Sequence, residues 1–487
     1  MNRRVYIVLF LLILFFKFDC LSQQLISIEE SIEIAKKNSL EIQEIKNKYN
    51  IVAYEYQIFN KSFYPTFDVS GNFPAFNRSI SKIILPNGDE AFVSQSTGSY
   101  SGKISINQPL PFWGSNLILS SGIQRLDLYN DKMTTSYLSN IINIGINQSI
   151  FKYNTYKWSR KIEPIKFFEA RQEYIEGIEN ISRKVVELYF NLLESQAKID
   201  IQIIKKMNMD SLFYIANGRY SVGKCTEDEV MQIEVNILNV ELQISNLINE
   251  RDKNKQLLCD FLQLKDTNII LVEPSLFYLP NINIDKAISE AMSNSSFEYN
   301  QRRKLLEGES NLAKIKSENK PSVDLYATLG LSKNDPSFKG TFQNPLNQEV
   351  VTLSFNVPIY DFGIRKKRIK QAELSLSNTI IDNEKEKQNK EIALIEIVSR
   401  INILDNNLIV VRKTQELSEK RLKMSKSRYE NGKIGFLEYS NALEELNNAK
   451  INYLNLLSEK WNLYYSLRKL TLYDFKENRS LVENYPQ

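Results

Sequence analysis

Four long segments of this sequence contain almost no helix-breaking residues, and they limit the possible folds more than any other feature. They cover about residues 156–222, 226–264, 364–431 and 436–472. The first is interrupted only by Pro164, Gly177 and Gly218. A helix of about 65 residues is about 100 Å long, roughly five times the average in globular proteins. Such a helix needs packing partners along its whole length, so the sequence predicts two pairs of very long, packed helices.

Between these segments, five short stretches alternate apolar residues with small polar ones, which is typical of amphipathic strands. Their apolar positions are Phe63, Phe67 and Val69; Ile104 and Ile106; Ile142, Ile144 and Ile146; Val323, Leu325, Ala327 and Leu329; and Val351, Leu353, Phe355 and Val357. A globular sandwich turns the polar face to water, whereas a membrane barrel turns the apolar face to lipid and the polar face to a wet lumen. The alternation alone leaves both arrangements open.

The chain also contains an internal repeat, which indicates a duplicated architecture. A shift of 256 positions aligns the N-terminal part with a later part; the matched pairs are Ile28 and Ile284, Ile32 and Ile288, Ala35 and Ala291, Asn38 and Asn294, Pro65 and Pro321, and Asp68 and Asp324. Further along, a shift of 209 matches Asn147 with Asn356, Ile150 with Ile359, Lys157 with Lys366, Arg219 with Arg428, Gly223 with Gly432, and Glu229 with Glu438. Because the shift falls from 256 to 209, the first half carries about 47 additional residues between Asp68 and Asn147, as an added strand pair or a long loop.

The N-terminus predicts export from the cytoplasm. Arg3 and Arg4 precede an apolar run, Val5–Phe16, and Cys20-Leu21-Ser22 provides a small-x-small cleavage pattern, so we expect a signal peptide at 1–22. Lipidation of Cys20 is the alternative, although larger residues than usual precede it. No later run is long and apolar enough for a membrane helix, so we expect that any entry into a membrane is as a barrel.

Composition argues against several classes of function. The chain has no histidine, which removes the commonest general base and metal ligand. Its 487 residues carry a net charge of only +4, so no overall field indicates nucleic acid. We also find no nucleophile elbow, phosphate-binding loop or metal-ligand spacing. We therefore expect no enzyme, no cofactor and no metal site.

The order and spacing of several short motifs resemble the TolC family of outer-membrane channel proteins, also called outer-membrane factors. The motifs are Ala35-x-x-Asn38, Tyr64-Pro65-x-x-Asp68, Val357-Pro-Ile-Tyr-Asp-Phe-Gly-Ile-Arg365, Arg428-Tyr-x-x-Gly-Lys433 followed by Glu438, Ala442 and Ala449, and Leu467-Arg-Lys-Leu-Thr-Leu-Tyr-Asp474. A further run, Lys157-Trp-Ser-Arg-Lys-Ile-Glu-Pro164, is similar to members of Bacteroidetes type. The resemblance covers essentially the whole mature chain.

This resemblance implies an α+β membrane protein in which three copies assemble. An outer-membrane β-barrel would continue into a long periplasmic α-helical coiled-coil barrel. The implied function is the outer-membrane channel of a tripartite efflux pump or a type I secretion system, a passive conduit across the periplasm and outer membrane. The implied partners are a periplasmic adaptor (membrane-fusion) protein, an inner-membrane pump of RND or ABC type, and outer-membrane lipid. The family gives four barrel strands per chain, so the added segment leaves the strand count open.

The alternative is a structural or adhesive cell-surface protein with a coiled-coil stalk. It would share the export signal and the long helices, but it would not need the repeated strand-strand-helix plan.

The domain organisation that we predict is a signal peptide at 1–22, N-terminal periplasmic helices at 23–62, barrel strands with the added segment at 63–151, a coiled-coil hairpin at 152–270, an equatorial segment and helix at 271–320, barrel strands at 321–360, a second hairpin at 361–471 and an equatorial tail at 472–487.

Two glycine turns lie far along the chain from the strands, which places them at the distal periplasmic tip. Gly223 and Gly432 would serve tight turns with positive φ. Acidic residues follow each turn, namely Glu227, Asp228 and Glu229 in the first repeat and Glu438 in the second. Acids also suit a helix N-terminus, which is the simpler explanation. With threefold symmetry they would instead form charged rings that favour cations at the entrance.

The resemblance implies further roles at this tip. Glu438 matches an acid that lines the constriction, but Asn441 stands where a second acid is expected. Tyr429 matches a tyrosine that holds the closed tip, whereas its usual arginine partner would fall at Ile434. The candidates for adaptor docking are Arg219, Lys224, Arg428 and Lys433, beside the two glycines; a solvated turn surface is the alternative.

Overall fold

The computed structural model describes residues 24–84, 88–129, 133–265 and 268–484. The predicted signal peptide, with Cys20, lies outside these ranges. The chain forms two compact units, each assembled from separate segments. The first, the helical unit, contains residues 1–49, 171–296 and 388–487; the second, the sheet unit, contains residues 50–170 and 297–387.

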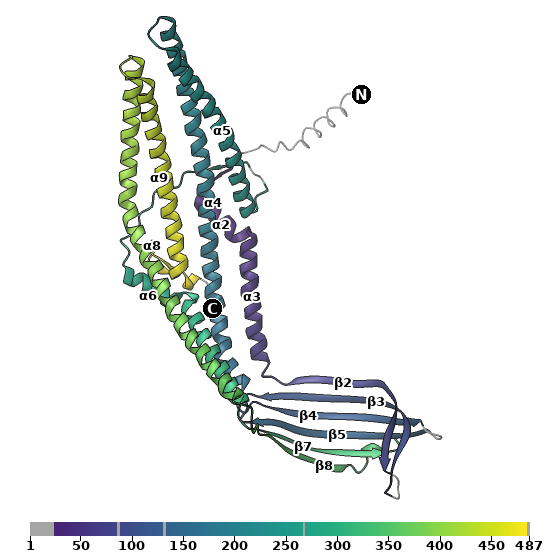
Figure 1. Ribbon diagram of the computed structural model, residues 1–487. Helices are drawn as coiled ribbons and strands as arrows, with labels where there is room; N and C mark the ends of the chain where they lie inside the picture. Colours follow the sequence, from purple (N-terminus) through teal and green to yellow (C-terminus); the bar gives the residue numbers. More distant parts are fainter. Residues whose placement is uncertain (1–23, 85–87, 130–132, 266–267, 485–487) are drawn as a thin grey trace, which may run out of the picture. The chain divides into compact units, whose positions relative to one another are not determined.

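The four long helices confirm the prediction from helix breakers (Figure 1). They are α4 (Thr155–Ser221), α5 (Glu227–Leu262), α8 (Ile364–Glu430) and α9 (Phe436–Thr471). Helices α4 and α8 each contain 67 residues, and α5 and α9 each contain 36. The equal lengths support the internal repeat. Helix α4 continues through Pro164, close to its N-terminus.

Shorter elements complete the helical unit. Helices α2 (Ile28–Asn38) and α6 (Ile284–Asn294) both have 11 residues and N-caps with side-chain hydrogen bonds. Strand β1 (Gln24–Ile26) pairs in parallel with β6 (Ile269–Leu271), and β9 (Tyr473–Asp474) pairs with β10 (Arg479–Ser480) ahead of the short 3₁₀ turn η2 (Val482–Asn484). The buried Tyr189 hydroxyl shares its single proton between the carbonyls of Ile26, at 2.9 Å, and Val272, at 2.6 Å.

Buried charge fixes one end of the helical unit. The Arg468 guanidinium makes a two-pronged contact with the Glu179 carboxylate, at 2.7 and 3.0 Å. It also contacts Asp474, which accepts a hydrogen bond from the Tyr464 hydroxyl at 2.8 Å. Removing one partner would leave a buried charge unpaired, which costs several kcal/mol, roughly 3–5. This network therefore holds α9 and the C-terminal segment onto α4.

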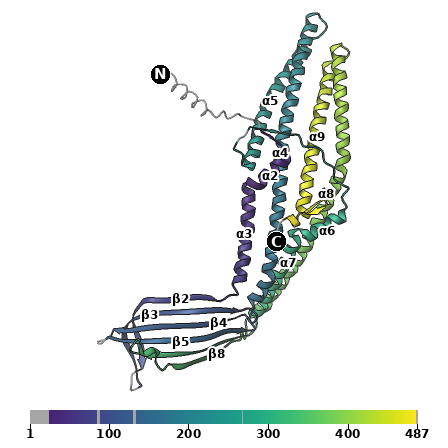
Figure 2. The same ribbon diagram turned by 180° about the vertical axis from the view of Figure 1, so that it is seen from behind.

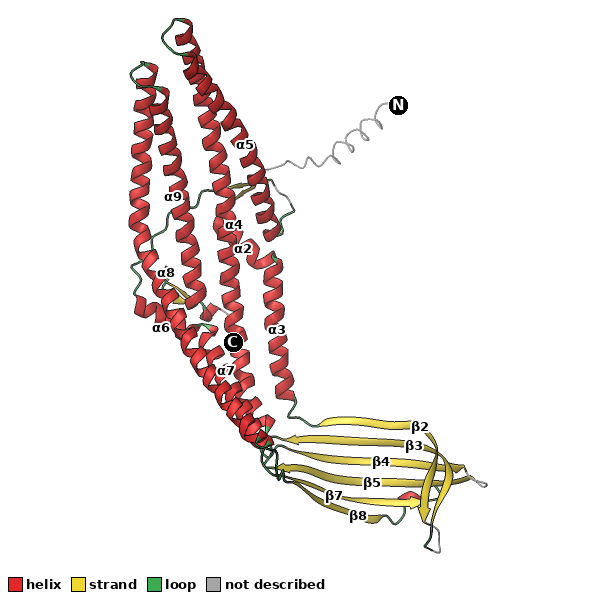
Figure 3. Ribbon diagram, in the orientation of Figure 1, coloured by secondary structure: helices red, strands yellow, loops and turns green. Residues whose placement is uncertain are grey.

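The sheet unit contains one antiparallel sheet with the strand order β2-β3-β4-β5-β7-β8 (Figure 3). The strands are β2 (Thr66–Ile84), β3 (Glu90–Leu110), β4 (Ser115–Tyr129), β5 (Met133–Ile150), β7 (Ser322–Asp335) and β8 (Leu346–Asn356), with a 3₁₀ turn η1 (Gly340–Phe342) between the last two. Helix α3 (Leu40–Lys61) precedes β2, and α7 (Ser296–Glu318) precedes β7. The first half of the chain thus supplies four strands and the second half two. The additional residues form β3 and β4, so they are the strand pair and not the long loop.

The two faces of this sheet differ in chemistry. On one face, paired residues place an apolar row across five strands: Phe67, Ile106, Leu119, Ile144 and Leu329. The other face carries small polar residues, including Asp68, Ser105, Ser120, Asn143, Gly330 and Gln348. Side chains on the apolar face are exposed in the single chain, for example Phe67 at 73% and Phe355 at 77%. In the part of the chain that the structure describes, no helix combines the length and the apolar character needed to cross a bilayer.

Candidate functional site

The two glycine turns have the same backbone geometry. Gly223 has φ +71° and Gly432 has φ +70°. In the first turn, the Lys224 amide donates to the Arg219 carbonyl at 2.8 Å, and in the second the Lys433 amide donates to the Arg428 carbonyl at 2.9 Å. This pattern ends a helix with a left-handed residue that glycine adopts without steric cost. The sequence prediction of tight glycine turns with positive φ is confirmed.

The next helix starts differently after each turn. Thr226 caps α5, since its hydroxyl accepts a hydrogen bond from the Glu229 amide at 3.3 Å. The matching position before α9 is Gly435, which makes no side-chain cap. A threonine cap stabilises a helix by about 1 kcal/mol relative to alanine, and glycine provides only part of that.

An arginine of the first turn contacts the second turn. The Arg219 guanidinium donates to the carbonyls of Tyr429, at 2.8 Å, and Glu430, at 3.0 Å. It also lies over the Tyr429 ring, 5.3 Å from the ring centre. These carbonyls belong to the last turn of α8, where main-chain acceptors lack helical partners and the helix dipole is negative. Arg219 therefore caps α8 from the neighbouring hairpin, and the two hairpins run side by side in both views (Figures 1 and 2).

Tyr429 forms the centre of an apolar cluster between the hairpins. It is fully buried with side chains from all four long helices; the cluster contains Met209, Leu212, Ala216, Ile233, Phe436, Tyr439 and Leu443. Burial raises the pKa of Tyr429 to about 12, and the negative charge of Glu229 adds to the rise. Ile434, where the resemblance would place an arginine, packs against this cluster.

Glu229 lies on the inner side of the tip with Cys225. The Cys225 thiol donates to the Glu229 carboxylate at 3.3 Å, and partial burial followed by that carboxylate raises the pKa of Cys225. The other predicted site residues are exposed: Lys224, Asp228, Arg428, Lys433, Glu438 and Asn441. The structure therefore divides the tip into an inner set, which contains the predicted residues Arg219, Glu229 and Tyr429 together with Cys225, and an outer, exposed set. The sequence reasoning missed the contribution of Cys225 and the cap of Thr226, although the short spacing of Cys225 before Glu229 on one helical start was a usable signal.

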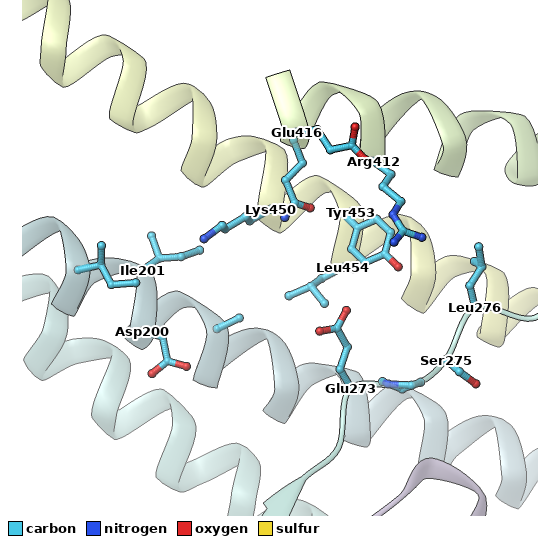
Figure 4. Close-up of a pocket in the computed structure, with 14 residues that line it drawn as sticks. Asp200, Ile201, Glu273, Ser275, Leu276, Arg412, Glu416, Lys450, Tyr453 and Leu454 are labelled. Carbon is cyan, nitrogen blue, oxygen red and sulfur yellow. The ribbon is translucent and has the colours of Figure 1, made fainter. Parts of the chain in front are cut away.

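A second concave region lies farther down the helical unit. A cavity of about 770 Å³ opens between α4, α8, α9 and the segment 273–276. Glu273 and Tyr453 point into it from opposite sides, and Arg412, Glu416 and Lys450 also line it (Figure 4). Burial and the charge of Glu273 raise the pKa of Tyr453. The charged groups that line this cavity have mixed signs. Among the described residues, no acidic or thiol cluster is suited to hold a metal ion.

Two helical hairpins that contact each other at their turns and a sheet that is apolar on one face are the features of this fold that can be compared with known proteins. Residues 309–473 match the outer membrane efflux protein family. The matched segment lies in the second half of the chain, and the fold of the whole chain is similar to that of outer-membrane channels. This family contains channels rather than enzymes.

Solved structures of outer-membrane channels share this fold across nearly the whole chain. The CmeC outer membrane channel of Campylobacter jejuni has 14% identity and a TM-score of 0.63, with 94% of this chain and 88% of that chain covered. The outer membrane protein VceC of Vibrio cholerae has 12% identity and a TM-score of 0.64, with 91% and 95% covered. The MtrE outer membrane channel of Neisseria gonorrhoeae has 14% identity and a TM-score of 0.59, with 91% and 88% covered. A comparison with curated proteins returned no significant match, and the similarity to members of Bacteroidetes type stays a prediction.

Proposed function

We propose that three copies of this chain form a passive duct that serves a tripartite efflux pump or a type I secretion system. The observation that carries the proposal is the open six-stranded sheet, which has one exposed apolar face and no strand paired to the outer side of β2 or β8 within the described residues. An unpaired strand edge cannot face lipid, because its main-chain groups would lose their hydrogen bonds. Identical copies arranged around a closed axis remove every edge.

The long helices support the same assembly. On α5, Val235, Leu238 and Leu242 are 57%, 59% and 63% exposed in the single chain. On α8, Ile403, Ile409 and Val410 are 53%, 57% and 62% exposed. Apolar side chains spread along two helices of this length need a partner surface. Helices of neighbouring copies provide one, and together they enclose a periplasmic duct.

The tip is the gate of this proposed duct. Arg219 and Tyr429 hold the two hairpins of one copy together, and the exposed Lys224, Arg428 and Lys433 provide a basic surface for a periplasmic adaptor. The adaptor links the duct to an inner-membrane pump, which supplies the energy. Opening then requires the turns to separate, and the first contacts to be lost are those between Arg219 and the end of α8.

Electron microscopy of the detergent-solubilised mature protein tests this function. We expect a threefold hollow cylinder longer than about 100 Å, because α4 and α8 alone have that length. A monomer, or a thin solid stalk, would refute the duct and favour the adhesive coiled-coil protein.

A further inference from the structure

Among the residues that the structure describes, the strands β3 and β4 have no counterpart in the second half of the chain. The shift of 256 aligns Pro65, before β2, with Pro321, before β7. The shift of 209 aligns Asn147, near the end of β5, with Asn356, at the end of β8. In the repeat, β2 therefore corresponds to β7 and β5 corresponds to β8. The pair β3–β4 is inserted between them.

These two strands carry the same division into faces as their neighbours. Ile106 of β3 pairs with Phe67 of β2, and Leu119 of β4 pairs with Ile144 of β5, all on the apolar face. The strands connect through a short turn at which the Gly114 amide donates to the Leu110 carbonyl at 3.0 Å. Short turns at one end and apolar residues along one face are features of barrel strands. A loop or a plug inside the lumen would not need an apolar row continuous with that of the flanking strands.

We propose that each copy contributes all six strands to a shared barrel, so that three copies close an 18-stranded barrel instead of a 12-stranded one. The strand number rests on the threefold assembly proposed above. Six is an even number, so β8 runs antiparallel to β2 in the sheet order. The β8 edge of one copy therefore meets the β2 edge of the next with antiparallel pairing, as membrane barrels require.

The internal repeat also predicts the register of this contact. Within one chain, β5 meets β7 with Asn147 opposite Tyr326. The shift of 209 carries Asn147 to Asn356, and the shift of 256 carries Tyr326 back to Ser70. Asn356 of one copy then lies opposite Ser70 of the partner subunit. The next pair is Phe355 with Gly71 of the partner subunit.

The two faces provide an independent check on this register. Asn356 lies opposite Ser322 on β7, and Ser70 lies opposite Lys103 on β3. Following the paired residues across the sheet places both Asn356 and Ser70 on the polar face. A register shifted by one residue would turn the apolar set of one strand toward the lumen. The repeat-derived register keeps both faces continuous around the barrel.

The strand number sets the width of the barrel. With strands about 4.8 Å apart and tilted by about 40°, 18 strands give a backbone diameter of about 36 Å and 12 strands about 24 Å. Side chains on the lumen side occupy about 5 Å from each wall, which leaves about 26 Å and about 14 Å. The wider lumen, lined by small polar residues, accommodates large hydrated cargo such as a polypeptide hairpin, since one helix with its side chains is about 10–12 Å across.

Disulfide formation between copies tests the interface in the full chain. In a background with Cys225→Ser and Cys259→Ala, the pair Ser70→Cys and Asn356→Cys should link copies into a covalent trimer on mild oxidation. The matched control is Val69→Cys with Asn356→Cys, which moves one thiol by a single residue to the opposite face and should give at least tenfold less product. Equal linking in both pairs, or none in the first, would overturn the register.

The strand number is tested on the unmodified protein. Cryo-electron microscopy should show 18 strands, and polymers of up to about 26 Å diameter added to the outer side should enter the barrel and reduce its conductance. A threefold particle with 12 strands and a cut-off near about 14 Å would overturn the six-strand contribution while leaving the duct intact. The absence of any ring-shaped assembly would instead overturn the duct, and the six-strand barrel with it.

Discussion

The two helical turns of this protein share one backbone and differ in chemistry. Both end a 67-residue helix, and both use a glycine with φ near +70°. In the first turn, Arg219 donates a hydrogen bond to the end of α8, and Thr226 caps α5. In the second turn, the main chain accepts that hydrogen bond, and α9 begins at Gly435 without a side-chain cap. Their sequences are related by one constant shift. Duplication therefore preserved the backbone geometry of the turns, whereas the contact between the hairpins depends on Arg219 of the first repeat.

The largest expected effect comes from removing the contact that crosses between the hairpins. Arg219→Ala should leave the last carbonyls of α8 without a charged donor, a loss of about 1.5–3 kcal/mol for hydrogen bonds to a charged group. The tip should open more often, which single-channel recordings would register as a higher open probability.

Arg428→Ala is the matched control, because Arg428 occupies the same position in the second repeat and is exposed. It should leave the recordings close to those of the wild type. Similar opening in both variants would show that the two turns contribute equally and that the asymmetry has no consequence.

Raising the pH should weaken the contact between the two hairpins, because it ionises the buried Tyr429 hydroxyl. Its folded pKa is raised to about 12 by burial and by Glu229, above the value near 10 that an exposed tyrosine has. A phenol with a raised folded pKa contributes full stability below pH about 10 and loses it as pH rises toward 12. The contact between hairpins should therefore weaken by about 2–3 kcal/mol across this window.

The measurement is the open probability between pH 9 and pH 12, with Tyr429→Phe as the reference. The phenylalanine variant lacks the titrating hydroxyl and should show a much flatter profile. A profile of the same steepness in both proteins would assign the effect to other groups.

A smaller effect is expected from the helix caps. Thr226→Ala should lower the stability of the first turn by about 1 kcal/mol, because the Glu229 amide loses its acceptor. Gly435→Ser, at the matched position, should raise the stability of the second turn by a few tenths of a kcal/mol. Hydrogen exchange of the backbone amides at the starts of α5 and α9 measures the two changes separately. Opposite signs are expected, and a stabilising Thr226→Ala would contradict the capping assignment.

The sequence predicted the parts of the fold that depend on local patterns. The long helices follow from the scarcity of glycine and proline, and both turns follow from Gly223 and Gly432. The choice between a strand pair and a loop for the added residues depended on pairing with β2 and β5, and long-range pairing leaves only a weak local signal. The contact of Arg219 with α8 could not be predicted from the sequence for the same reason, because it joins residues about 210 positions apart.

The smallest effect tests whether the outer acids of the two repeats act alike. Glu438 is exposed at the start of α9, whereas its counterpart Glu229 is engaged with Cys225. Glu438→Gln should therefore remove an exposed charge from each copy and lower the cation-to-anion permeability ratio by about twofold. Glu229→Gln should change that ratio less and alter open probability more, because its carboxylate faces the contact between the hairpins. Reversal potentials in a salt gradient measure the ratio. If the ratio is unchanged in the Glu438 variant, the outer acids do not line the entrance. If the ratio changes more in the Glu229 variant, the inner set lies along the path of the ions.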